Sequence, residues 1–205
     1  MFNEIEWLFF DVGSTIMNEQ IAYEHRIRDM ANLANMSFEK IYEMALAYYR
    51  QNKKGDRETA KFLGIEVPEW HREDEILYDD ALPCFETLSK KYKIGIIANQ
   101  SFGTKDRLEK HGILKYIDLI TASAEEGVEK PNRRIFEIAL ERCNCKSVHT
   151  IMIGDIIDND IVPANLIGMN TIWIKRGFWQ YWNIKQKLEK PDFVINNLME
   201  LCDIL

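Results

Sequence analysis

Apolar residues in this chain gather in short runs that are separated by longer amphipathic stretches. The runs predict strands at residues 5–10, 93–99, 117–123, 149–155, 170–175 and 192–195. Helical spacing of apolar residues predicts helices at residues 82–91, 104–111, 132–143, 159–167 and 197–204. Strands that alternate with helices are typical of an α/β fold, in which a parallel sheet is covered by helices on both faces.

Residues 17–80 differ from the rest of the chain because no strand pattern occurs in them. Apolar residues recur there at helical intervals from about 17 to 53, with Ser37 as a candidate N-cap, and a shorter helix is expected at 57–63. A helical segment of this length offers no strand to pair with the sheet. We therefore predict that it is an insertion after the first strand.

Charge and composition exclude several classes of protein. The formal net charge is −7, which argues against partners such as nucleic acid or an anionic membrane, because both require a basic surface. No apolar run approaches the roughly 20 residues of a membrane span, and the first residues, MFNEIEW, lack the basic region of a secretory signal. The four cysteines have no CxxC spacing and the four histidines no HExxH spacing. We expect reduced thiols, no zinc site and a cytoplasmic protein. The sequence does not determine the oligomeric state.

Polar and charged side chains stand at or just beyond the ends of several predicted strands. Ligands of an open parallel sheet bind outside the carboxyl ends of its strands, so these residues are expected to share one edge: Asp11, Asn99, Lys130, Asp155, Asp158 and Asp160. Singly, each has an ordinary explanation, since Asp is common in turns and the proline after Lys130 suits the start of a helix. Together they favour a magnesium–phosphate site, because Mg²⁺ prefers oxygen ligands and a lysine can neutralise a phosphate oxygen. A carboxylate can also be the nucleophile in phosphoryl transfer.

The segments that carry these residues resemble the ordered motifs of a known family. In chain order they are FFDVGST, IGIIANQ, EKPNRRIF and IGDIIDNDIVPA, and they are similar to the four motifs of the haloacid dehalogenase-like hydrolase superfamily. The helical insertion and the phrase GMNTIWIKRG resemble the subfamily with an α-helical cap of the first type. The resemblance covers nearly the whole chain. It implies a Rossmann-like core of residues 1–16 and 81–205, a mobile α-helical cap of residues 17–80, bound Mg²⁺, and hydrolysis of a phosphate ester through an aspartyl-phosphate.

The resemblance also implies roles for individual residues. Asp11 matches the catalytic nucleophile, and Lys130 matches the catalytic lysine that steadies the nucleophile and the phosphoryl group. Asp155 and Asp160 match the acidic metal positions. Asp11 and the backbone carbonyl of Gly13 would complete the Mg²⁺ ligands. The partner implied is a small phosphorylated substrate.

Two positions depart from the family's pattern. Its phosphatases usually carry an aspartate two residues after the nucleophile as general acid and base, and here that residue is Gly13. Their second motif usually ends in a Ser or Thr that binds a phosphoryl oxygen, and here that residue is Ala98. Asn99, Ser14 and Thr15 are the nearby candidates for binding phosphate. No hydroxyl can replace a carboxylate as a base at neutral pH.

Three functional hypotheses remain open after these departures. A positioned acid–base group contributes about 10²–10⁴ in rate, so the first is a Mg²⁺-dependent phosphatase of reduced or altered activity that favours good leaving groups. The second is a 2-haloacid dehalogenase-type hydrolase, which uses the same nucleophile, lacks the second aspartate and needs no metal. The third is a catalytically impaired phosphate-binding or interaction protein, because a fold does not fix a function. The retained segment GDIIDND favours the phosphatase over the dehalogenase.

Two further features bear on substrate and partners. The cap is expected to select the substrate, and Tyr23, Arg26 and Arg57 are candidates for reaching into the site. The aromatic segment GFWQYW at residues 177–182 either packs a loop against the core or forms an exposed partner surface, and packing is the favoured interpretation.

Overall fold

A parallel sheet of six strands forms the centre of the structure, a computed structural model that describes residues 4–205. The strands are β1 (Trp7–Phe10), β4 (Lys93–Ala98), β5 (Leu119–Ala122), β6 (Thr150–Gly154), β7 (Asn170–Ile174) and β8 (Phe193–Ile195). Their order is β5-β4-β1-β6-β7-β8, and each neighbouring pair is parallel. This sheet confirms the predicted α/β fold. Residues 1–3 of the predicted core lie outside the described residues.

Helices cover both faces of the sheet, and the central strand β1 contributes to both buried layers. Leu8 and Phe10 lie in one apolar cluster and Phe9 lies in another, as expected for a strand buried on two sides. The helices that pack on these clusters are α4 (Ala81–Leu88), α5 (Thr104–Lys110) and α9 (Leu201–Ile204) on the first, and α7 (Arg133–Cys143) and α8 (Val162–Leu166) on the second. Gly95 leaves room for Phe9, because a Cβ there would lie 2.4 Å from the ring.

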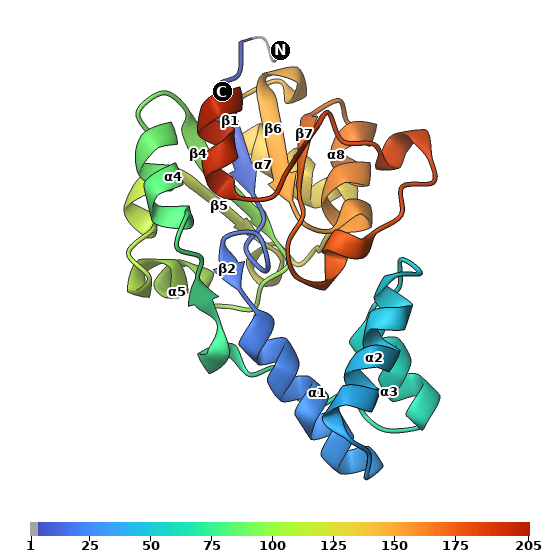
Figure 1. Ribbon diagram of the computed structural model, residues 1–205. Helices are drawn as coiled ribbons and strands as arrows, with labels where there is room; N and C mark the ends of the chain where they lie inside the picture. Colours follow the sequence, from blue (N-terminus) through green and yellow to red (C-terminus); the bar gives the residue numbers. More distant parts are fainter. Residues whose placement is uncertain (1–3) are drawn as a thin grey trace.

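Three helices inserted between β1 and α4 stand beyond the carboxyl ends of the strands (Figure 1). They are α1 (Gln20–Ala34), α2 (Phe38–Tyr49) and α3 (Gly55–Leu63). Ser37 caps α2, because its side chain accepts a hydrogen bond from the amide of Lys40. These helices confirm the predicted helical insertion, which we call the cap. The division into residues 1–16 and 81–205 against 17–80 stays a prediction.

Two short strands connect the cap to the sheet, and the prediction that residues 17–80 contain no strand is wrong. β2 (Met17–Asn18) pairs antiparallel with β3 (Ile76–Leu77). Each strand has two residues, which is too short for an alternating pattern to be visible in the sequence. The pairing brings the two ends of the cap side by side.

The segment after β6 differs from the predicted helix over residues 159–167. It begins with a π-helical turn, η4 (Ile157–Ile161), and α8 follows directly. Single π-helical turns inside helices are frequent at functional sites. The remaining short helical elements are η1 (Arg72–Asp74), η2 (Leu114–Tyr116), α6 (Ser123–Glu126), η3 (Ser147–His149), η5 (Gly177–Tyr181), η6 (Lys187–Glu189) and η7 (Leu198–Glu200).

The aromatic segment after β7 is packed, as the favoured interpretation predicts, but it packs against the cap and not against the core. Phe178 and Trp179 on η5 are buried in one cluster with apolar residues of α1, α2 and α3. The ring of Phe178 stacks on Tyr49 with a centroid distance of 4.7 Å. The four cysteines are free thiols. Within residues 4–205, none of the helices combines the length and the apolar character that crossing a bilayer requires.

Candidate active site

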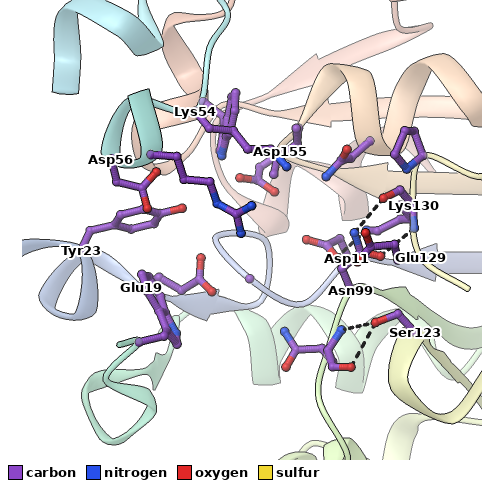
Figure 2. A pocket seen from close by; sticks show the side chains of 18 of the residues that line it. Asp11, Glu19, Tyr23, Lys54, Asp56, Asn99, Ser123, Glu129, Lys130 and Asp155 are labelled. Atoms are coloured by element: carbon purple, nitrogen blue, oxygen red, sulfur yellow. Dashed lines mark hydrogen bonds and ion pairs between the residues drawn. The ribbon is translucent and has the colours of Figure 1, made fainter. Parts of the chain in front are cut away.

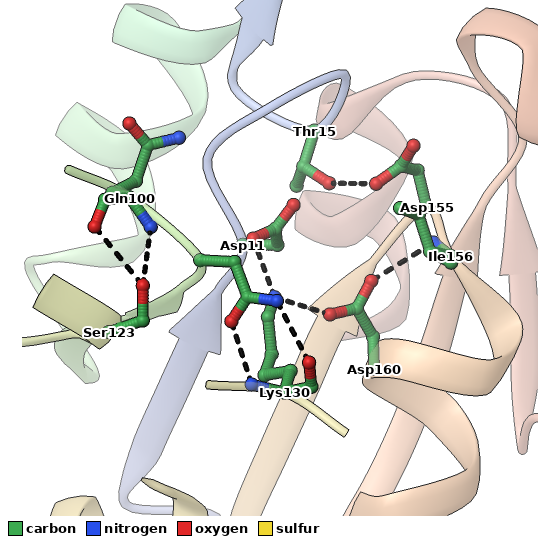
Figure 3. Close-up of polar contacts among 9 residues, drawn as sticks. Asp11, Thr15, Gln100, Ser123, Lys130, Asp155, Ile156 and Asp160 are labelled. Carbon is green, nitrogen blue, oxygen red and sulfur yellow. Dashed lines mark hydrogen bonds and ion pairs between the residues drawn. The ribbon is translucent and has the colours of Figure 1, made fainter. Parts of the chain in front are cut away.

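Lys130 lies at the centre of a buried cluster of carboxylates. Its Nζ donates hydrogen bonds to Asp11 Oδ1 at 2.6 Å and to Asp160 Oδ1 at 2.5 Å (Figure 3). The Lys130 side chain is 2% exposed, so this charge is held away from water. Burial alone lowers the pKa of Lys130, but the two carboxylates outweigh it and raise that pKa above its ordinary value. The lysine is therefore a permanent positive charge beside Asp11.

Asp155 completes the cluster with a carboxylate that is only partly paired. Thr15 Oγ1 donates a long hydrogen bond of 3.4 Å to Asp155 Oδ1. Among the described residues, none gives a hydrogen bond to Asp155 Oδ2, although this oxygen is buried. Burial, then the like charges of Asp11 and Asp160, raises the pKa of Asp155 well above its ordinary value. A buried carboxylate oxygen without a partner is the feature expected where a cation binds.

Asp11, Asp155 and Asp160 are close enough to share one ion. Ligand oxygens of the three carboxylates lie within 4.8 Å of one another. The π-helical turn η4 carries Asp160, whose Oδ2 accepts a hydrogen bond of 2.9 Å from the amide of Ile156. Burial raises the pKa of Asp160 to about 7, although Lys130 opposes this shift. Both oxygens of Asp160 are thus engaged within the protein, whereas Asp155 Oδ2 has no hydrogen-bond partner in residues 4–205.

Gly154 gives Asp160 the space that it occupies. A Cβ on Gly154 would lie 2.4 Å from Asp160 Cγ and 2.4 Å from Oδ2. The Asp160 side chain therefore folds over the end of β6 and reaches Lys130 only because residue 154 has no side chain. The glycine of the IGD segment is required by this close approach and not by an unusual backbone angle.

Asn99 positions Lys130 through its backbone. Its Oδ1 accepts a hydrogen bond of 2.7 Å from the amide of Lys130, and its Nδ2 donates one of 2.9 Å to the carbonyl of the same residue. Asn99 also lines the cavity described below, with one amide hydrogen left over, and its role in binding phosphate stays a prediction. Ala98 is buried and brings no hydroxyl to this strand end. Ser123, at the start of α6 and directly after β5, also lines the cavity. Its hydroxyl accepts a hydrogen bond from the amide of Gln100 and donates one to the carbonyl of the same residue.

Ser14 and Thr15, the other two candidates for phosphate, have carboxylate partners. Ser14 Oγ donates a hydrogen bond of 2.9 Å to Glu19 Oε2, and Thr15 Oγ1 is directed at Asp155. Both residues are buried, and neither of them lines the cavity. Their assignment as phosphate ligands stays a prediction that these contacts do not favour.

A cavity of about 550 Å³ opens between this cluster and the cap. Figure 2 shows Asp11, Lys130 and Asn99 on one side of it, with Glu19, Tyr23 and Lys54 facing them. The predicted cap residues Tyr23, Arg26 and Arg57 all line it. Arg26 donates a hydrogen bond of 2.7 Å to Asp56, while among residues 4–205 its buried Nε has no partner. The cap thus places cationic side chains opposite the anionic cluster.

Glu19 is the residue in this cavity that the sequence patterns do not indicate. It precedes α1 and its carboxylate faces the cavity. Burial raises the pKa of Glu19 to about 8, the Ser14 hydrogen bond opposes the shift, and the charges of Glu75 and Asp11 add to it. An acidic side chain with so perturbed a pKa in a cavity is typical of functional sites.

His25, Asp29 and His71 form a second group, outside the cavity lining, whose possible ligand atoms lie within 4.8 Å of one another. The two imidazoles stack with centroids 3.5 Å apart. His25 Nδ1 pairs with Asp74 and His71 Nε2 pairs with Asp29. These pairs connect α1 to the segment around η1, and the spacing of histidines in the sequence could not predict them.

Comparison with known proteins gives one family and a consistent set of relatives. The profile of a family described as HAD-hydrolase-like matches residues 128–201. A glyceraldehyde 3-phosphate phosphatase of Methanopyrus kandleri is 34% identical over 131 residues, which cover 62% of this chain and 56% of that protein. The pyrimidine 5'-nucleotidase YjjG of Escherichia coli is 40% identical over 127 residues, which cover 61% and 55%. The chain spans about half the length of the curated relatives it matches.

Solved structures match over nearly the whole chain. The HAD-hydrolase YfnB of Bacillus subtilis, bound to magnesium, has a TM-score of 0.71 at 23% identity and covers 99% of each chain. A structure described as a dehalogenase has a TM-score of 0.72 at 16% identity and covers 100% of this chain and 99% of its own. At these identities the likeness shows the fold, which includes the helices inserted after β1.

We expect Gly154→Ala to displace the Asp160 carboxylate and to destabilise the protein by about 1–3 kcal/mol, because the new methyl group overpacks a buried site. Urea denaturation of the wild type and the variant measures this change. In an Asp160→Gly background the side-chain atoms that clash with the new methyl group are gone, so Gly154→Ala should be less destabilising there. Equal effects in the two backgrounds would contradict the proposed packing.

Proposed function

Because the chain belongs to the haloacid dehalogenase-like hydrolase superfamily, we propose that it is a Mg²⁺-dependent phosphatase that acts on a small phosphorylated metabolite through an aspartyl-phosphate on Asp11. The observation that carries this proposal is the buried cluster in which Lys130 holds Asp11, while one oxygen of Asp155 has no partner in the described part of the chain. Relatives named as a glyceraldehyde 3-phosphate phosphatase and a pyrimidine 5'-nucleotidase support it.

The residues of the cluster fit a divalent cation. Asp11, Asp155 and Asp160 bring three carboxylates to one site, and Lys130 pairs with two of them, Asp11 and Asp160. Mg²⁺ prefers such hard oxygen ligands and also retains water and substrate oxygens. We propose that Asp11, Asp155 and the carbonyl of Gly13 hold the ion, and that Asp160 contributes chiefly by fixing Lys130, since both its oxygens are engaged. When bound, Mg²⁺ would neutralise charge on the phosphoryl group.

The chain's own residues suit a two-step hydrolysis. An oxygen of Asp11 attacks the phosphorus, the bond from phosphorus to the ester oxygen breaks, and the leaving oxygen receives a proton to become an alcohol. Water then attacks the phosphorus, loses a proton to a base, and releases phosphate with the Asp11 carboxylate restored. Lys130 offsets the negative charge that Asp11 and the phosphoryl oxygens bring together.

The cavity favours a small anionic substrate. Its volume of about 550 Å³ lies within the range of small-molecule sites. Arg26, Lys54 and Arg57 line the cap side, and they would meet the part of the substrate that lies away from Asp11. A dehalogenase would need no metal, and the buried, unpartnered oxygen of Asp155 speaks against that alternative.

The activity itself is tested by phosphate release from a panel of small phosphate esters. We expect turnover with Mg²⁺ and none with EDTA, and Asp11→Asn should lower turnover by at least on the order of 10³ because it removes the nucleophile. Glu43→Gln, on the exposed face of α2, is the matched control and should act like the wild type. Phosphatase activity that survives Asp11→Asn, or metal-independent halide release from a 2-haloacid, would contradict the proposal.

Mg²⁺ binding is tested by thermal unfolding in MgCl₂ and in NaCl of the same ionic strength. A ligand that binds only the folded protein stabilises it, by about 2.7 kcal/mol at one hundred times its dissociation constant. We expect Mg²⁺ to raise the melting temperature of the wild type and to leave that of Asp155→Asn unchanged. Asp118→Asn, which breaks a surface pair with Lys93, should keep the Mg²⁺ effect. An equal shift in the wild type and in Asp155→Asn would show that the ion binds elsewhere.

A further inference from the structure

The Glu19 carboxylate occupies the space of the side chain that residue 13 lacks. A Cβ built on Gly13 would lie 2.5 Å from Glu19 Oε1 and 2.9 Å from both Cδ and Oε2. Oε1 is thus about as far from that point as a carboxylate oxygen of aspartate is from its own Cβ. Glu19 can lie beside position 13 only because residue 13 has no side chain.

The local fold brings Glu19 back to Gly13 over six residues. After Asp11 the chain closes a tight turn, in which the amides of Ile16 and Met17 both donate to the carbonyl of Val12. The chain then forms β2 and enters α1, which begins directly after Glu19. Ser14 Oγ donates a hydrogen bond of 2.9 Å to Glu19 Oε2 and fixes the direction of the carboxylate.

Other carboxylates of the cavity are less suited to proton transfer at Asp11. Among the described residues that line it, those outside the Lys130 cluster are Glu19, Asp56 and Glu129. Asp56 accepts hydrogen bonds from Arg26 and Tyr49 and is engaged on the cap. Glu129 is exposed beside Lys130 in sequence. Of these described carboxylates, Glu19 alone lies against Gly13, which is two residues after Asp11.

We propose that Glu19 is a catalytic residue of this protein and supplies the general acid and base that position 13 does not provide. The inference rests on the proposed phosphatase function. In the first step the protonated carboxyl of Glu19 gives its proton to the leaving oxygen as the bond from phosphorus to that oxygen breaks. In the second step the resulting carboxylate takes a proton from the attacking water as the bond from phosphorus to Asp11 breaks. Glu19 is then protonated again and the cycle closes.

This assignment explains why residue 13 is glycine. Any side chain at that position would collide with the Glu19 carboxylate, which the Ser14 hydrogen bond holds in place. An aspartate introduced at 13 would therefore compete with Glu19 for one space and would not simply add a missing group. With the acid–base group present, the protein is not restricted to substrates with good leaving groups.

The test compares the wild type, Glu19→Gln and the control Glu43→Gln, on the exposed face of α2, with an alkyl phosphate and with p-nitrophenyl phosphate, all with Mg²⁺. Glutamine keeps the shape of Glu19 but cannot transfer the proton, so alkyl phosphate turnover should fall by about 10²–10⁴. With p-nitrophenyl phosphate, rapid mixing should show a burst of one nitrophenolate per Glu19→Gln molecule, because a good leaving group departs unaided and the aspartyl-phosphate then waits for an unassisted water. The wild type and Glu43→Gln should show no burst.

Each outcome separates the inference from the proposed function. An active wild type with an equally active Glu19→Gln protein overturns the role of Glu19 and leaves the phosphatase in place. The same holds if Glu129→Gln, tested as a second variant of the cavity, shows the loss and the burst and Glu19→Gln does not. A wild type that releases no phosphate from either ester overturns both the inference and the proposed function.

An exchange variant tests whether the two positions serve one space. Glu19→Ala should have low turnover. The double variant Glu19→Ala/Gly13→Asp should turn over at least tenfold faster than Glu19→Ala, because the vacated space now accepts the aspartate. Gly13→Asp alone should not exceed the wild type. No gain from Gly13→Asp in the Glu19→Ala background contradicts the proposed exchange.

Discussion

The buried ammonium group of Lys130 is the contact on which the rest of this site depends. Three carboxylates from two strand ends could not be buried together without a compensating charge, because removing one partner of a buried pair leaves an uncompensated charge in the interior. Lys130 meets Asp11 at the end of β1 and Asp160 after β6. Asn99, after β4, holds the lysine's backbone in place. Segments next to three adjacent strands are therefore fixed around one positive charge, while Asp155 stays open to a cation.

Two glycines give this cluster its shape by leaving room for carboxylates that come from further along the chain. Gly154 admits Asp160, six residues later, and Gly13 admits Glu19, also six residues later. In both places a tight turn returns the chain onto the strand end, and in both a hydrogen bond fixes the returning side chain, from Ile156 to Asp160 and from Ser14 to Glu19. Gly13, which departs from the family's pattern in the sequence, is thus a point of close approach in the structure.

Much of the fold and part of the site could be predicted from the sequence, for identifiable reasons. The strands β1, β4 and β6 are apolar runs that can be recognised in the sequence. The carboxyl ends of parallel strands share one edge of the sheet. The topology therefore brings together the four charged residues Asp11, Lys130, Asp155 and Asp160. The pair β2 and β3 could not be predicted, because two residues carry no periodicity. Glu19 was not predicted either, since its position depends on a turn closed by the carbonyl of Val12 and not on any spacing. For the same reason the partners of Ser14 and Asn99 could not be predicted, because they depend on how the chain folds back and not on residue spacing.

The central claim is that Asp11 and Glu19 face one phosphoryl group from the core and from the start of the cap. A crystal structure of the protein with Mg²⁺ and orthovanadate, which mimics the five-coordinate phosphorus of phosphoryl transfer, tests this claim most directly. The account predicts vanadium next to an Asp11 oxygen, and the Glu19 carboxylate within hydrogen-bond distance of the apical oxygen on the opposite side. A structure in which vanadate binds at Asp11 while Glu19 is turned away, with Glu129 or another group at the apical oxygen, would contradict it.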